Sequence, residues 1–212
     1  MSGKIKIDIV SDVVCPWCVI GYKRLERAIS DLKLEEKIQI QWKPFELNPN
    51  ISKDGENITK HLNRKYGMSV DDVENFQSNM TKMGKEEGFK FDHFTEMKIV
   101  NTRDAHILLD FAKEYGKQTE LKMRLFESFF TERKDVSNRI ILLDAIKEIG
   151  LDEEKALLIL ENDANLEIQK EEEYWKSLGI TGVPTIMFND AVTLNGAQSI
   201  DTYKKILENL TS

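Results

Sequence analysis

The sequence predicts an α/β fold in which both ends of the chain build one sheet and a long helical block lies between them. Apolar residues alternate with charged or polar ones at 5–9 and 38–42, which is typical of two short strands. Between these strands, apolar residues recur every three or four positions and predict an amphipathic helix over about 16–33. The rest of the sheet is expected near the C-terminus, over 185–194.

The first strand, helix and second strand should form a parallel, right-handed unit. From about Asn57 to about Leu178 the pattern is helical almost throughout and predicts about six helices. The expected N-caps are Ser69, Thr119, Ser137 and Asp152, and the expected helix-ending glycines are Gly67, Gly116 and Gly150. Residues 185–188 and 191–194 then predict a hairpin, and Ser199 is placed to cap a final helix.

Length and charge limit the classes of protein that fit. A chain of 212 residues suggests one large domain or two closely joined ones, and 41% hydrophobic with 32% charged residues is typical of a globular protein. The 30 Lys and Arg residues against 37 Asp and Glu residues give a net charge of -7. This charge disfavours nucleic acid and anionic lipid surfaces as partners.

The chain also lacks signals for a membrane or for secretion. Its longest apolar runs are far shorter than the roughly 18 residues that a bilayer span needs. Residues 1–8 alternate charged and apolar side chains, unlike a secretory signal, so a cytoplasmic location is expected. In a reducing compartment, two cysteines close in sequence are more often catalytic or metal-binding than structural.

The two cysteines stand in Cys15-Pro16-Trp17-Cys18, directly after the first strand and at the start of the first helix. Pro16 suits the first helical position, which makes Cys15 the N-cap. A thiolate there would accept hydrogen bonds from free amides and feel the positive end of the helix dipole. This placement predicts that the pKa of Cys15 falls from about 8.5 into the range of about 3.5 to 7.5. Cys18, one turn later and facing inward, would then be the resolving thiol.

This arrangement suggests thiol:disulfide exchange. Cys15 would attack a substrate disulfide and form a mixed disulfide, and Cys18 would release the product; the reverse path is oxidation. A zinc site is disfavoured because the pair supplies half of a tetrahedral set, and His61, His93 and His106 lie far along the chain. Haem attachment needs a histidine after Cys18, where Val19 stands. We therefore expect no metal and no resident cofactor.

A second informative segment is Thr181-Gly182-Val183-Pro184-Thr185, in which Pro184 opens a predicted strand. A cis peptide bond between Val183 and Pro184 would turn the backbone sharply into that strand. It would also leave the N–H and C=O of Val183 free to pair with an extended substrate. The isomer itself is not readable from the sequence.

Together, residues 11–18 and 181–185 resemble the DsbA family of thioredoxin-like oxidoreductases and, more narrowly, its cytoplasmic FrnE-like branch. The stretches 42–49, 101–106 and 195–198 support the resemblance over nearly the whole chain. It implies a thioredoxin-like fold with a large all-α helical insertion.

The resemblance also implies a division into domains and a set of site residues. Residues 1–52 and 163–212 would form the thioredoxin-like domain, and 53–162 the inserted helical domain, with the substrate cleft between them. Catalytic roles would fall to Cys15, Cys18 and a cis Pro184, and substrate contacts to Pro16, Trp17, Val183 and Asn101. Protein or small-molecule disulfides would be the substrates, with glutathione as a possible redox partner; no oligomeric state is implied.

Two other functions stay open. Glutathione-dependent isomerases and transferases of the same superfamily usually carry serine where Cys15 stands and lack a second cysteine. A binding protein or chaperone without redox turnover is the other alternative.

Four polar positions have competing interpretations. Either Asp12 or Glu46 would be the carboxylate that assists Cys18, or each is an exposed charge. Asn101 would face the cleft or cap a helix. His106, between apolar neighbours, is better read as a packed helix histidine than as a catalytic one.

Overall fold

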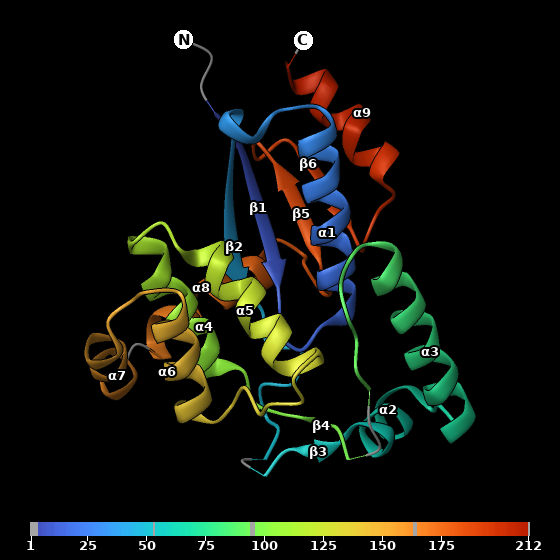
Figure 1. The fold of residues 1–212 in the computed structure, drawn as a ribbon, viewed down its shortest axis with the longest axis vertical. Helices are drawn as coiled ribbons and strands as arrows, with labels where there is room; N and C mark the ends of the chain where they lie inside the picture. Colours follow the sequence, from blue (N-terminus) through green and yellow to red (C-terminus); the bar gives the residue numbers. More distant parts are fainter. Residues whose placement is uncertain (1–3, 53, 94–95, 163–164, 212) are drawn as a thin grey trace.

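The computed structural model describes residues 4–52, 54–93, 96–162 and 165–211 (Figure 1). Its larger sheet has four strands in the order β2-β1-β5-β6. The strands are β1 (Ile5–Ser11), β2 (Ile38–Pro44), β5 (Thr185–Phe188) and β6 (Val192–Asn195). Strands β1 and β2 are parallel, with Ile5 opposite Ile38, whereas β5 is antiparallel to both β1 and β6. The predicted strands, their parallel pairing and the C-terminal hairpin are confirmed.

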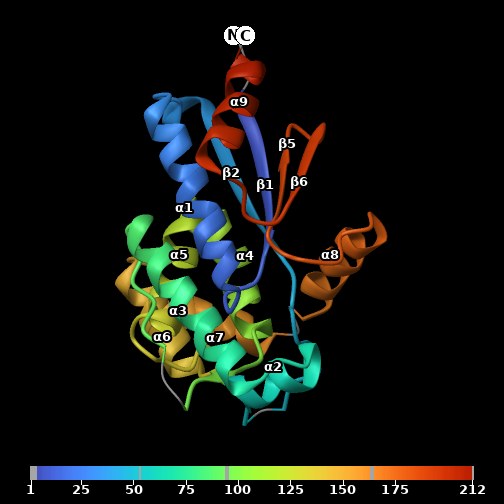
Figure 2. The same cartoon turned by 90° about the vertical axis from the view of Figure 1, so that its right-hand side faces the viewer.

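Two helices cover one face of this sheet. They are α1 (Pro16–Asp31), which connects β1 to β2 through the short 3-10 turn η1 (Glu35–Lys37), and α9 (Ile200–Thr211). They pack against each other, and Figure 2 shows both on the side of the sheet opposite α8. Strand β1 lies in the middle of the sheet and is buried almost throughout, so its polar residues Asp8 and Ser11 are enclosed as well.

The helical block lies between β2 and β5 in the chain. Within the described residues it contains seven helices, against a prediction of about six. The helices are α2 (Ile58–Tyr66), α3 (Val70–Glu86), α4 (Arg103–Glu114), α5 (Gln118–Phe130), α6 (Arg139–Glu148), α7 (Glu153–Glu161) and α8 (Asn165–Ser177). A short antiparallel ribbon of β3 (Glu56–Asn57) and β4 (Lys98–Ile99), which the sequence did not predict, lies beside α2.

Two of the four predicted N-caps are correct. Ser69 forms a capping box with Asp72 at the start of α3, and Asp152 caps α7. The other two predictions are wrong: α5 begins after Lys117, and α6 is capped by Asn138. In each case the expected hydroxyl has another partner, because Thr119 Oγ1 accepts from Trp42 Nε1 and Ser137 Oγ donates to Asp135 Oδ1.

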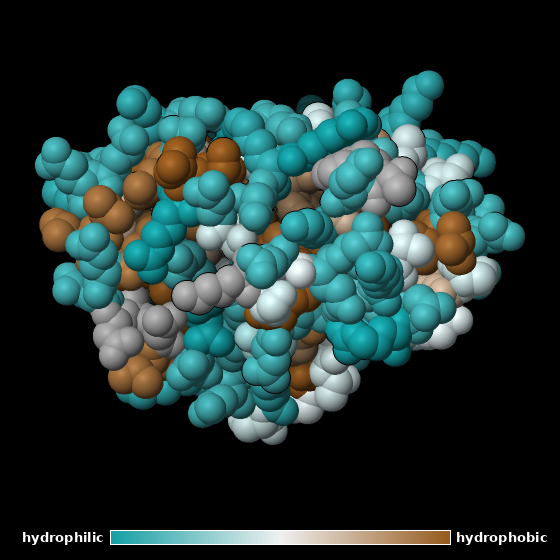
Figure 3. Space-filling model, turned by 90° about the horizontal axis from the view of Figure 1, so that it is seen from below, coloured by the Kyte–Doolittle hydropathy of each residue, from teal (hydrophilic) through white to brown (hydrophobic). Residues whose placement is uncertain are grey.

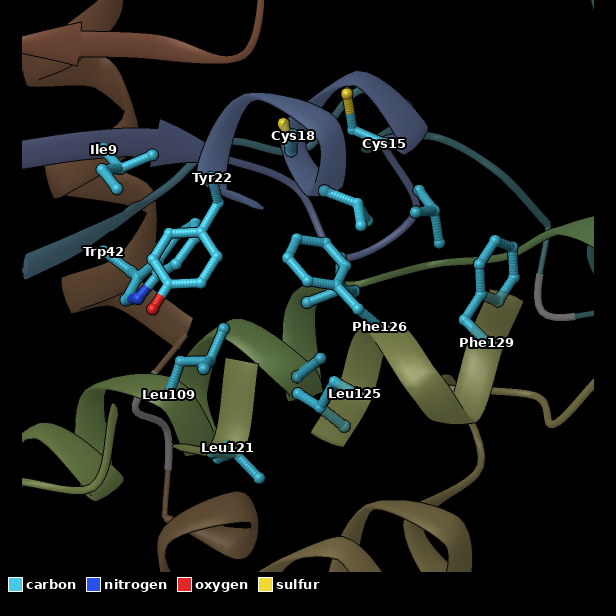
Figure 4. Close-up of a cluster of buried hydrophobic side chains, with 14 of the residues drawn as sticks. Ile9, Cys15, Cys18, Tyr22, Trp42, Leu109, Leu121, Leu125, Phe126 and Phe129 are labelled. Carbon is cyan, nitrogen blue, oxygen red and sulfur yellow. The ribbon is translucent and has the colours of Figure 1, made fainter. Parts of the chain in front are cut away.

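One hydrophobic core runs through the sheet layer and the helical block. The two parts meet where α4, α5 and α8 contact β2. Trp42 of β2 lies at this junction, with its ring centroid 5.0 Å from that of Tyr22 and 6.1 Å from that of Phe126 (Figure 4). The thioredoxin-like fold with its helical insertion is thus present, whereas the domain boundaries at 52/53 and 162/163 stay a prediction.

On the surface, Figure 3 shows the β3–β4 side of the molecule, where hydrophilic side chains separate several apolar areas. Of the described helices, none is both long enough and apolar enough to cross a bilayer.

The packing of α3 yields a stability prediction. A Cβ atom on Gly84 would lie 2.4 Å from the ring of Phe91 and 2.6 Å from the carbonyl oxygen of Phe89. Because the carbonyl belongs to the backbone, Gly84→Ala should lower the free energy of unfolding by about 1–3 kcal/mol. Urea unfolding measures this loss, and Lys85→Ala at the exposed next position should stay within about 0.5 kcal/mol of the parent. An unchanged Gly84→Ala midpoint would contradict the described packing.

Candidate active site

The cysteine pair lies at the start of α1. Cys15 is the N-cap, with extended backbone angles, and Pro16 follows within the first turn. The Cys18 N–H donates to the carbonyl oxygen of Cys15 at 3.1 Å, which closes that turn. Both thiols are free. Cys15 is 4% exposed, whereas Cys18 is fully buried. Figure 4 shows both side chains on the first turn of α1, with Phe126 of α5 beneath Cys18.

The segment before β5 approaches the same turn. The Val183–Pro184 peptide bond is cis, and the Cys15 thiol donates to the Val183 carbonyl oxygen at 3.7 Å between sulfur and oxygen. A Cβ atom on Gly21 would lie 3.3 Å from Cγ of Pro184, so a glycine on this face of α1 allows the close approach. The two motifs that the sequence suggested as partners are therefore in contact.

The charge state of the pair differs from the prediction. Burial raises the pKa of the Cys15 thiol well above its usual value, and the contact with Cys18 raises it further. The Cys15 side chain makes no capping hydrogen bond to the helix amides, because its sulfur faces the Val183 carbonyl as a donor. The expected low pKa of Cys15 is therefore wrong for the dithiol in this structure. Burial also acts to raise the pKa of Cys18, but Cys15, Ser11 and Lys122 together lower it.

An apolar cavity of about 330 Å³ opens beside Cys15. Three of the predicted substrate-contact residues, Pro16, Trp17 and Val183, line it. The remaining lining comes mostly from apolar and aromatic side chains of α2, α3, α5 and the segment that contains β4, including Leu62, Tyr66, Phe76, Met97, Ile99 and Phe129. The cavity is thus walled by the cysteine turn on one side and by the helical block on the other.

Asn101, the fourth predicted substrate-contact residue, lies elsewhere. Its Oδ1 accepts from the N–H of Arg103 at 3.0 Å, so it satisfies a first-turn amide of α4, as a helix-capping side chain does, although the N-cap residue itself is Thr102. In the described part of the chain it lines a separate polar cavity of about 1060 Å³, together with Arg103 and Glu172. The structure does not bring Asn101 to the cavity beside Cys15.

Of the two candidate carboxylates, Asp12 is the one that interacts with the cysteine pair. It is buried, and its Oδ2 accepts from the N–H of Leu47 at 2.8 Å. Its Oδ1 lies 3.4 Å from Nε2 of His106. Burial acts to raise the pKa of Asp12, but His106 and the Leu47 amide outweigh it and the pKa is lowered. His106 is buried in α4, as expected of a packed histidine.

Glu46 belongs to a different network. Its carboxylate pairs with Arg103, and its backbone N–H donates to the carboxylate of Glu172. Burial raises the pKa of Glu46 even though Arg103 opposes the shift. Glu46 therefore connects the segment after β2 with α4 and α8.

A residue that the sequence reasoning missed is Lys122, which is fully buried in α5. It shares a helical face with Leu125, Phe126 and Phe129, and a charged residue on an apolar stripe is a signal that the sequence does contain. Within the described ranges, no group of three or more His, Cys, Asp or Glu side chains is arranged to hold a metal ion.

The pKa of Asp12 yields a pH-dependent stability prediction. Because its folded pKa lies below the ordinary 3.8, ionised Asp12 stabilises the fold above that value, and the stabilisation is lost as the pH falls through the folded pKa. Asp12→Asn should therefore be less stable than the parent by a constant amount above about pH 5, and the difference should shrink below about pH 4. Urea unfolding of both proteins across this range measures it. A difference that stays constant down to about pH 3 would contradict the pKa assignment.

Comparison with known proteins places this site in a family. The family model for the DSBA-like thioredoxin domain matches residues 6–208. The uncharacterised protein YwbO of Bacillus subtilis (strain 168) is 27% identical over 205 residues, which cover 96% of each chain. The crystal structure of the probable DsbA oxidoreductase SCO1869 from Streptomyces coelicolor superimposes with a TM-score of 0.90 at 27% identity, covering 98% of this chain and 90% of that one.

A more distant solved structure is similar in fold. The cytosolic disulfide reductase DsbM from Pseudomonas aeruginosa with GSH superimposes with a TM-score of 0.65 at 15% identity, covering 97% of this chain and 98% of that one. The family model spans nearly the whole chain, including the cysteine turn, the cis-proline segment and the helical block between them. The chain belongs to the DSBA-like thioredoxin domain family.

Proposed function

We propose that this protein is a thiol:disulfide oxidoreductase that works through Cys15 and Cys18 and a mixed disulfide on Cys15. The observation that carries the proposal is a pair of free thiols at the start of α1, of which Cys15 donates to the Val183 carbonyl and lines an apolar cavity. Membership of the family supports the same class of reaction.

The exposure of the two sulfurs supports an order of events. Cys15 lines the cavity, whereas Cys18 is sealed behind it, so a substrate disulfide would meet Cys15 first. The Cys15 thiolate forms a bond to one substrate sulfur, and the other substrate sulfur leaves as a thiolate. Cys18 then gives up its proton to the departing substrate thiolate and attacks the Cys15 sulfur as a thiolate, which releases the second substrate sulfur as a thiolate and closes the Cys15–Cys18 disulfide. The substrate is reduced by two electrons and the pair is oxidised; the reverse sequence oxidises a dithiol substrate.

Substrate binding would also adjust the proton on Cys15. The Val183 carbonyl accepts from the Cys15 thiol in this structure. An extended substrate that donates a backbone N–H to the same oxygen would compete with that thiol. The Cys15 proton would then pass to the adjacent Cys18 sulfur, leaving Cys15 as the attacking thiolate. Val183 would thus couple docking of the substrate to activation of the nucleophile, and Pro184 would position this carbonyl.

The lining of the cavity favours substrates with an apolar group next to the disulfide. Aromatic and aliphatic side chains form most of its wall, and Lys65 lies at its edge. A polypeptide with a hydrophobic residue beside its cystine, or a small apolar disulfide, would bury that group here. Glutathione is proposed as the small thiol that returns the pair to its starting redox state, and the cytoplasm as the compartment.

The cysteine variants test this function. Cys15→Ser should lower the reduction of insulin disulfides by at least about 100-fold, because it removes the nucleophile. Cys18→Ser should retain the first attack but accumulate a mixed disulfide, because the second thiol is missing. Mass spectrometry of the protein quenched with acid measures the adduct on Cys15.

Activity that survives Cys15→Ser would end the proposal. Turnover by Cys18→Ser with glutathione at the parent rate would instead favour a glutathione-dependent isomerase or transferase. Client binding that persists in the double serine variant without any turnover would favour a chaperone.

The apolar cavity makes a separate prediction about specificity. Tyr66 lines the cavity with 62% of its side chain exposed, so a substitution there need not disturb the core. Tyr66→Glu should lower kcat/KM for a disulfide peptide with a flanking Leu or Phe by about 3-fold to 30-fold, because a charge would replace apolar contact area. The rate with a small polar disulfide should not change. Tyr115→Glu, at an exposed tyrosine after α4, is the matched control and should leave both rates unchanged.

A further inference from the structure

Lys122 is a buried cation at the centre of the molecule. Its side chain is fully buried, and among the described residues no group makes a hydrogen bond to its Nζ. The ammonium lies 5.2 Å from the ring of Trp42 and 5.1 Å from the ring of Phe126. A lysine in such a place is costly unless a negative charge nearby compensates for the lost hydration.

One of the two rings that contact Lys122, that of Phe126, lies below the cysteine turn. Figure 4 shows Phe126 beneath Cys18 and Trp42 next to Tyr22, which is one turn after Cys18 in α1. Cys18 is fully buried, so water does not solvate its sulfur when the proton leaves. The resolving thiol must nevertheless become an anion before it can attack.

Several other titratable groups lie around Lys122 and Cys18. The anions that interact with Lys122 are Cys18, Asp12 and Cys15, in falling order of effect. Asp12 already accepts a hydrogen bond from the Leu47 amide and lies beside His106, so these two groups compensate for part of its negative charge. The titratable groups that face Lys122 or Cys18 from the surrounding elements are Asp12 after β1, Cys15 and Tyr22 of α1, Lys43 of β2, His106 and Asp110 of α4, Glu171 of α8 and Tyr203 of α9.

We propose that Lys122 is the positioning cation that holds Cys18 as a thiolate while it resolves the mixed disulfide. The inference deepens the proposed function and rests on it. Lys122 comes from the helical insertion and both cysteines from the sheet domain, so the insertion would supply the charge that the reaction of the pair needs. Lys122 itself touches no substrate.

This role links the redox state of the pair to the charge on Lys122. Burial lowers the pKa of Lys122 to about 8, and the anionic groups beside it oppose the shift. When the Cys15–Cys18 disulfide closes, the Cys18 sulfur no longer carries a charge. The pKa of Lys122 should then fall further, by the same factor with which Lys122 stabilises the thiolate. Reduction of the disulfide restores both charges.

The test follows the second of two thiol steps with a chromogenic reagent. Reduced protein is mixed with dithionitrobenzoate: attack by Cys15 releases one coloured thiolate, and attack by Cys18 on the mixed disulfide releases the second. The rate of the second release is measured against pH for the parent and for Lys122→Met, which keeps the side-chain length and removes the charge. Lys155→Met, at an exposed lysine of α7, is the control.

In Lys122→Met the pH midpoint of the second release should rise by about one unit. Below both midpoints that release should be about 3-fold to 10-fold slower, because the lower thiolate fraction is partly offset by greater nucleophilicity. The control should match the parent. An unchanged midpoint in a folded Lys122→Met protein would overturn the proposal and show a purely structural lysine, while the wild-type two-step release would leave the proposed function standing. A wild-type protein with no second release would instead refute the proposed function.

A second measurement needs no variant, in case Lys122→Met does not fold. NMR titration of the lysine side chains compares the oxidised and reduced wild-type protein. The resonance of Lys122 should titrate at a lower pH in the disulfide form than in the dithiol form. Equal midpoints in the two forms would overturn the proposal.

Discussion

The contact between the Cys15 sulfur and the Val183 carbonyl depends on joining the two ends of the chain. The residues lie 168 positions apart, and the contact forms because β5 pairs with β1 while α1 begins at the end of β1. Burial of β1 in the middle of the sheet holds this geometry, since a shift of one residue would reverse the faces of all its side chains. Gly21 then lets α1 approach Pro184 closely. The position of the nucleophile therefore follows from the packing of the sheet.

The helical block does more than cover the sheet. It builds most of the apolar wall beside Cys15, and it places His106 and Lys122 next to the buried polar groups below the cysteine turn. Buried charges are expensive, and two networks in the structure show how such charges are compensated. Asp12 is balanced by the Leu47 amide and His106, whereas Glu46 and Glu172 gather around Arg103. The first network adjoins the sulfur chemistry, and the second connects α4 and α8.

The electrostatics of the pair show how burial can outweigh a helix terminus. The start of α1 would favour an anion at Cys15, yet the residue is 4% exposed and its sulfur faces a carbonyl oxygen. Burial and the contact with Cys18 raise the pKa of Cys15, a carbonyl acceptor also favours the protonated thiol, and the pKa of Cys18 is lowered. In the proposed cycle, a substrate N–H would replace the Cys15 thiol as donor to the Val183 carbonyl, and Cys15 would become the thiolate. Without substrate the nucleophile would stay protonated and unreactive, and docking of the substrate would activate it.

Much of the fold is visible in the sequence, since short-range patterns determine it. Alternation predicted β1 and β2, helical periodicity predicted α1 and α9, and the cysteine motif after a strand predicted the reactive turn. Thr119 and Ser137 failed as caps because each hydroxyl found a different partner. Asn101 could have faced the cleft or capped a helix, and its side chain accepts from a first-turn N–H of α4 instead of lining the cavity beside Cys15. The choice between Asp12 and Glu46 depended on which of them the chain folds toward the cysteines. The sequence by itself determined the strands of the larger sheet, the helices α1 and α9 and the position of the cysteine motif, because local spacing encodes them. The raised pKa of Cys15, the apolar cavity and the burial of Lys122 were decided by tertiary structure, because they depend on which distant segments lie within a few ångströms of one another.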